Sequence, residues 1–203
     1  MRRLKGLFLG LVLLLSGCAA SITPTPVLIH RLVNSNNEVK QLYLACSTGP
    51  NYTPEKAGCA SQLLEDKTVA TMGLAKEFIS ADIKQPQGYD IYLSISMIYF
   101  RIALRNTNDY SEAERIARQF FEIQKATSGR SLPDARFYWA AVSAGHAAWQ
   151  WSNDRLALNA DRKADLLLCY AEGNIAFQGM EPGPRKIRLL QYLEVLKAIT
   201  DAI

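Results

Sequence analysis

The chain has 203 residues, of which 49% are hydrophobic and 21% are charged. This composition is typical of a globular protein, and the length suits one domain with a sizeable core. The formal net charge is +4, but Arg2, Arg3 and Lys5 all lie in the first five residues. Without these three side chains the charge falls from +4 to +1, which is too weak to indicate a nucleic-acid partner.

The N-terminus has the layout of a secretory signal, with a basic head and an apolar run from Leu7 to Leu15. The run is too short for a membrane-spanning helix, which needs about 20 apolar residues. The ending Leu15-Ser16-Gly17-Cys18 resembles the lipobox of bacterial lipoproteins. That resemblance implies that residues 1–17 are a signal peptide and that Cys18 carries a covalent lipid. An ordinary signal peptide with an incidental cysteine is the alternative.

The segment after Cys18 is expected to be a lipidated tether over 18–27, because Thr23-Pro24-Thr25-Pro26 favours extended backbone. A single domain is expected over 28–203. In the lipoprotein family an Asp after the lipidated cysteine typically retains the protein at the inner membrane, and Ala19 stands there instead. The resemblance therefore implies a lipid anchor in the outer membrane, facing the periplasm.

Three further cysteines are present, Cys46, Cys59 and Cys169. An exported chain meets an oxidising compartment, and Cys46 and Cys59 flank a turn-rich segment, so a disulfide between them is expected. Two buried thiols are the alternative. Cys169 lies in an apolar run and is interpreted as a small, unpaired core residue.

The rest of the sequence predicts an all-α fold, because no segment shows sustained two-residue alternation between turns. Short connections make successive helices antiparallel hairpins, which form either a tetratricopeptide-like stack or a closed bundle. Among these helices the one at 89–106, which is apolar on most of its circumference, is expected to form the centre of the core. The sequence predicts about eight helices, at about 35–46, 54–64, 67–80, 89–106, 111–127, 133–152 and 161–178, and a last one that follows the break at 181–184 and includes residues 188–203.

One segment, roughly 90–124, resembles a tetratricopeptide repeat. A polar turn follows a helix there, and Tyr110 and Ala113 occupy the aromatic and small positions of the repeat. This resemblance implies helical hairpins and no particular function. A second similarity, over 133–141, is to the tryptophan-containing helix of lipoproteins associated with TRAP transporters, which implies ligand handling.

No residue pattern indicates a metal site or a catalytic centre. The two histidines, His30 and His146, are far apart in the sequence, and no zinc-binding, nucleophile-elbow or phosphate-loop motif occurs. Ser111 and Glu114 have capping-box spacing, which would place a helix start at Ser111. We therefore predict a protein that is not an enzyme and that carries no cofactor except the lipid on Cys18.

The helix at 134–152 is the best candidate for a binding surface. At about 100° per residue, one stripe holds Trp139, Val142, His146 and Trp149. This stripe is predicted to border a groove for a partner, since aromatic side chains are favoured in binding pockets. An ordinary core with a hydrogen-bonded histidine is the alternative. The opposite stripe is small and is predicted to pack against another helix; it consists of Ala141, Ala144, Gly145 and Ala148.

These observations favour a lipid-anchored scaffold, assembly factor or accessory subunit that binds a protein in the cell envelope. Ligand handling for a TRAP-type transport system is the alternative, and an enzyme of unknown type comes third. The sequence does not indicate the oligomeric state.

Overall fold

The computed structural model describes residues 25–48, 62–103 and 107–203. This part of the chain contains α-helices and one short 3₁₀ helix and no strand, which confirms the all-α prediction. None of its helices has the length and apolarity that crossing a membrane would require. The helices are α2 (Thr25–Thr48), α3 (Gln62–Ala81), α4 (Pro86–Ala103), α5 (Thr107–Ala126), α6 (Leu132–Asn153), η1 (Arg155–Ala157), α7 (Ala160–Gly179) and α8 (Pro184–Ala202).

Local sequence signals explain where several helices begin. Pro86 is the first residue of α4, and α6 and α8 also have a proline in their first turn, where a missing backbone N–H costs no helical hydrogen bond. Asn159 caps α7, because its side chain accepts a hydrogen bond from the backbone N–H of Arg162 at 2.9 Å.

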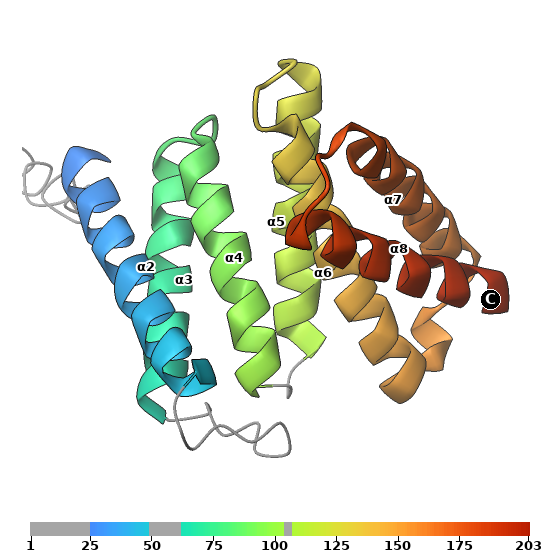
Figure 1. The fold of residues 1–203 in the computed structure, drawn as a ribbon, viewed down its shortest axis with the longest axis horizontal. Coiled ribbons are helices and arrows are strands. Elements are labelled where there is room, and N and C mark those ends of the chain that lie inside the picture. The colour runs from blue at the N-terminus through green and yellow to red at the C-terminus, as the bar shows by residue number, and fades with distance from the viewer. Residues whose placement is uncertain (1–24, 49–61, 104–106) are drawn as a thin grey trace, which may run out of the picture.

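The helices form an open row (Figure 1). Helices α2 to α6 stand side by side, while α8 crosses in front of α6 and α7 at a steep angle. Each helix packs against the next, and α2, α4, α6 and α8 also contact one another in that order, so they form one layer. Helices α3, α5 and α7 lie behind this layer, and α2 and α8 lie at opposite ends of the row.

The central helix is α6, which packs against α4, α5, α7 and α8. Most of its residues between Phe137 and Ala147 are buried, on every side of the helix. Helix α4 also packs against four α-helices, α2, α3, α5 and α6, but it is less completely buried than α6. The expectation that the helix at 89–106 forms the centre of the core is therefore wrong. Its first half is buried, including Tyr92 and Ile95, but Ile98, Tyr99, Phe100 and Ile102 are only half-buried, and Ile98 borders an open groove.

Gly173 of α7 shows how closely the C-terminal helices pack. A Cβ atom added there would lie 2.7 Å from a methyl group of Leu193 in α8 and 3.3 Å from Cβ of Ala140 in α6. A larger side chain would push these helices apart, so glycine at this position permits the close contact among α6, α7 and α8.

Several predicted boundaries are wrong. Helix α2 begins at Thr25, so the expected tether does not extend to residue 27; Pro26 lies in the first turn, where proline is tolerated. Residues 62–81 form one continuous helix, without the predicted break after Leu64. Helix α5 begins at Thr107, so Ser111 lies inside the helix and forms no capping box with Glu114.

The cysteine predictions have different outcomes. Cys169 is buried and unpaired, as predicted, and its burial raises the pKa of the thiol, which makes it unreactive. The Cys46 side chain and Cys59 lie outside the described residues, as does Cys18, so the disulfide and the lipid remain predictions.

Candidate functional site

The stripe predicted on α6 divides into buried and accessible parts. Val142 and Trp139 are each 2% exposed and His146 is 7% exposed, whereas Trp149 is half-buried. Trp139 and His146 border a pocket of about 260 Å³ between α5, α6 and α7, but Val142 and Trp149 do not line it. The other lining residues are Ser111, Glu114, Arg115, Arg118, Arg162 and Asp165.

The small-residue stripe is also only partly confirmed. Ala141 and Ala144 are buried, and a Cβ atom on Gly145 would lie 3.3 Å from the ring of Tyr110 in α5. Ala148 is exposed, so the closely packed face ends before it. His30, the other histidine, is exposed on α2 and lies apart from this region.

A buried carboxylate, Glu114 of α5, lies at the floor of this pocket. Arg162 of α7 donates from both terminal nitrogens, Nη1 to Oε1 and Nη2 to Oε2, each at 2.9 Å. Ser143 of α6 donates to Oε1, and Nδ1 of His146 lies 2.6 Å from Oε2. Because a carboxylate can only accept, Nδ1 carries the proton of this hydrogen bond. The carboxylate of Glu114 thus connects α5, α6 and α7, and both of its oxygens accept hydrogen bonds.

Burial alone would raise the pKa of Glu114, but the hydrogen bonds from His146, Arg162 and Ser143 and the charge of Arg162 lower it to about 2. Glu114 therefore carries its negative charge at neutral pH. Its charge is balanced by Arg162, and its side chain is 13% exposed.

The hydroxyl of Ser111, the imidazole of His146 and the carboxylate of Glu114 lie next to one another in the order found in a hydrolytic triad. Their geometry nevertheless favours a structural role. The Ser111 hydroxyl lies 3.5 Å from Nε2 of His146, at the limit of a hydrogen bond. Ser111 is inside α5, where backbone N–H groups bond within the helix and cannot stabilise an oxyanion. We interpret the cluster as a buried connection between α5, α6 and α7.

The rim of this pocket is electrostatically balanced. Arg118 donates to Asp165 at 3.2 Å and lies over the ring of Trp139, which itself stacks on Phe121 with the ring centres 4.7 Å apart. The indole therefore contacts two residues of α5 and is only 2% exposed. Every charged side chain that lines this pocket has an oppositely charged partner. For Arg115 that partner lies in the next pocket along α5.

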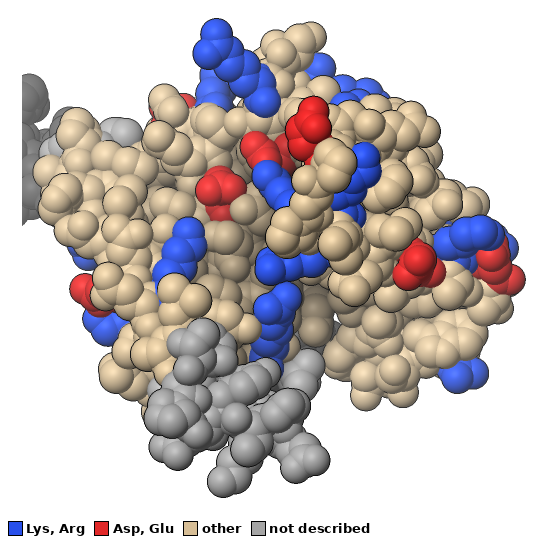
Figure 2. All heavy atoms as spheres, viewed as in Figure 1, with Lys and Arg blue, Asp and Glu red and all other residues tan. Residues whose placement is uncertain are grey.

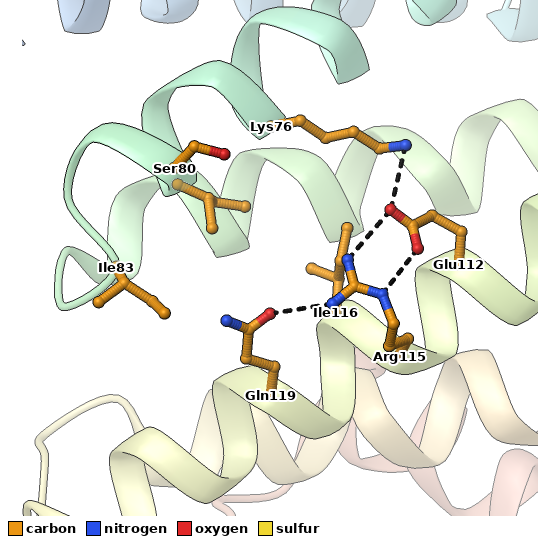
Figure 3. Close-up of a pocket in the computed structure, with 8 residues that line it drawn as sticks. Lys76, Ser80, Ile83, Glu112, Arg115, Ile116 and Gln119 are labelled. Carbon is orange, nitrogen blue, oxygen red and sulfur yellow. Dashed lines mark hydrogen bonds and ion pairs between the residues drawn. The ribbon is translucent and has the colours of Figure 1, made fainter.

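That next pocket lies between α3 and α5 (Figure 3). Lys76 and Arg115 both point to the carboxylate of Glu112, at 3.2 Å and 2.8 Å, and Gln119 accepts from Arg115. Ile79, Ile83 and Ile116 form its apolar part. Since its charges are also paired internally, this pocket offers little to a charged partner.

A third pocket differs from these two in its charges and lies in the layer formed by α2, α4, α6 and α8. It is a groove of about 230 Å³ with α4 and α8 as walls, α6 as the floor and α2 at one end; we call it the arginine groove. Figure 2 shows basic side chains following a hollow down the middle of this face, with acidic side chains gathered near its upper end. The groove is lined by Tyr43, Ser94, Met97, Ile98, Arg101, Phe137, Tyr138 and Arg188.

The two arginines of this groove have no acidic partner among the described residues. Arg101 donates to the hydroxyl of Tyr43 at 3.2 Å, which is a neutral group. Arg188 makes no hydrogen bond or ion pair within the described part of the chain. Tyr138 donates to Asp90 at 2.7 Å, so that carboxylate is bound to a phenol rather than to an arginine.

Sequence reasoning missed the residues that matter most at these sites. A signal for Glu114 existed, because it falls in the stripe of Tyr110, Ala117 and Phe121, which are all buried. A carboxylate in an apolar stripe needs a buried partner. No comparable signal identified Arg101 and Arg188, which lie on separate helices and come together only in the fold.

The described residues contain no group of three or more His, Cys, Asp or Glu side chains that could hold a metal ion. No family model matches this chain, and no curated protein or solved structure matches it.

Proposed function

We propose that this protein is a lipid-anchored envelope protein that binds another protein through the arginine groove. The observation that carries the proposal is a groove whose arginines lack acidic partners among the described residues, lined by tyrosine and phenylalanine. Arginine and aromatic residues are the types enriched in the parts of protein interfaces that contribute most binding energy.

The shape of the groove favours a protein partner over a small ligand. Pockets for small molecules are concave, mostly apolar and typically about 300–1,000 Å³ in volume. The arginine groove is smaller, at about 230 Å³, and opens along a helical face. This supports a scaffold, assembly factor or accessory subunit over the ligand-handling alternative.

The anchor is proposed from the lipobox-like ending at Cys18. Replacement of Cys18 by Ser should remove the site of lipidation and release the protein from outer-membrane fractions into the periplasmic fraction. Fractionation of cells followed by a high-salt wash measures this. If Cys18→Ser still sediments with membranes after that wash, the lipid anchor is the wrong explanation.

Site-specific photo-crosslinking in intact cells tests the partner. A benzoylphenylalanine at Ile98, in the groove, should give a discrete adduct with an envelope protein. The matched control is Leu167, an exposed apolar residue on α7 away from the groove, which should give none. Equal adducts from the two positions, or none from Ile98, would contradict a groove-specific partner.

A further inference from the structure

We infer that the arginine groove binds an extended, acidic segment of a protein, with carboxylates on Arg101 and Arg188 and apolar side chains over Ile98 and Phe137. This rests on the proposed function, and it adds the chemistry and the conformation of the partner. Two basic side chains contributed by α4 and α8 face one groove, and no Asp or Glu of the described residues lines it.

The charge argument comes from a comparison of the three pockets. Arg115 and Arg118, in the pockets beside α5, are already bound by Glu112 and Asp165. Arg101 and Arg188 keep guanidinium donors for a ligand, and arginine binds carboxylates through paired, charge-assisted hydrogen bonds. Of the three pockets, the arginine groove is therefore the one best suited to a negatively charged partner.

The floor and one wall supply contacts for uncharged side chains. Phe137 and Tyr138 come from α6, and Met97 and Ile98 are half-buried on α4. The groove has a volume of about 230 Å³. Side chains of an extended segment fit such a volume, and alternate residues of that segment can reach the arginines and the apolar floor.

Aspartate residues near the groove affect where a bound acidic segment can place its carboxylates. Asp90 is bound to Tyr138, and Asp134 pairs with Arg185, which lies over the ring of Phe137. These acidic groups are on the side where α6 begins, whereas Arg101 is near the end of α4. A carboxylate on Arg101 would therefore lie away from Asp90 and Asp134, and Asp134 is already paired with Arg185, one turn before Arg188 in α8.

Fluorescence anisotropy with the full chain in detergent tests this inference. The probe is a fluorescein-labelled peptide in which Glu alternates with Leu and Tyr, and its counterpart has Gln in place of every Glu. The acidic peptide should bind at least about tenfold more tightly than the Gln peptide, and its binding should weaken as salt rises. The double variant Arg101→Gln/Arg188→Gln should lose about tenfold in affinity for the acidic peptide.

The matched control is Lys84→Gln/Arg130→Gln, which removes the same charge from two exposed side chains outside the groove. It should bind like the unaltered protein. The reversed variant Arg101→Glu/Arg188→Glu should prefer a peptide in which Lys replaces Glu, a change that general destabilisation would not produce. Melting curves should match for all these proteins, because both arginines are exposed.

Equal binding of the Glu and Gln peptides, or unchanged binding by Arg101→Gln/Arg188→Gln, would overturn the acidic-segment inference. If the Ile98 crosslink nevertheless forms, the groove still binds a protein and only the proposed chemistry is wrong. If neither crosslink nor peptide binding is seen, the proposed function fails together with the inference.

Discussion

Replacement of Glu114 by Gln should destabilise the domain by about 3–5 kcal/mol, as expected when one partner of a buried ion pair is removed. The carboxylate bonds to Arg162 through both oxygens and to Ser143 and His146. An amide could accept only part of these hydrogen bonds, and Arg162, whose side chain is 14% exposed, would keep a charge without a counter-charge. Urea unfolding followed by circular dichroism measures the change in free energy of unfolding.

The control is Glu38→Gln, the same substitution in an exposed ion pair. Glu38 lies 2.6 Å from Lys67, and these side chains are 54% and 42% exposed. Its loss should be below about 1 kcal/mol, because solvent screens exposed pairs. If Glu114→Gln proves as mild as Glu38→Gln, the cluster contributes little to the connection between α5, α6 and α7.

The acid dependence of stability should separate the two variants further. The pKa of Glu114 is lowered to about 2 in the folded protein, below the usual value of about 4.3 for an unfolded chain. Its contribution is therefore fully present above the unfolded value and is lost as the pH falls toward 2. Glu114→Gln should lack this part of the acid destabilisation, whereas Glu38→Gln should retain it.

The helical fold was predictable because its signals are local. Pro133 was predicted to open a helix and lies in the first turn of α6, a position that depends only on the neighbouring residues. Residues 25–27 were assigned wrongly for a related reason: a proline such as Pro26 breaks a helix interior but is accepted in the first turn, and the sequence does not state which applies.

The centre of packing was less predictable because it depends on which helices meet. Helix α4 is more apolar than α6, and each packs against four other α-helices, yet α6 is the more completely buried of the two. Its small residues, including Ala140 and Ala144, allow several helices to approach it closely. Hydrophobicity along a helix therefore identified buried faces but did not show which helix is the most completely buried.

The two tryptophans that the sequence placed on one binding face should behave differently. Trp139→Ala should cost about 3–5 kcal/mol, as truncation of a buried aromatic residue does, because the indole is 2% exposed and stacks on Phe121. Trp149→Ala should cost clearly less, since Trp149 is half-buried and lines none of the three pockets described above. Urea unfolding of the two variants, measured side by side, gives the difference.

Binding provides the second measurement on these variants. Neither tryptophan lines the arginine groove, so both variants should still give the Ile98 crosslink at temperatures where they remain folded. The contrary result is informative because Trp139 borders the pocket between α5, α6 and α7. If Trp139→Ala unfolds like the unaltered protein but loses its crosslinked partner, the face predicted on α6 also contributes to binding and the arginine groove is not sufficient for it.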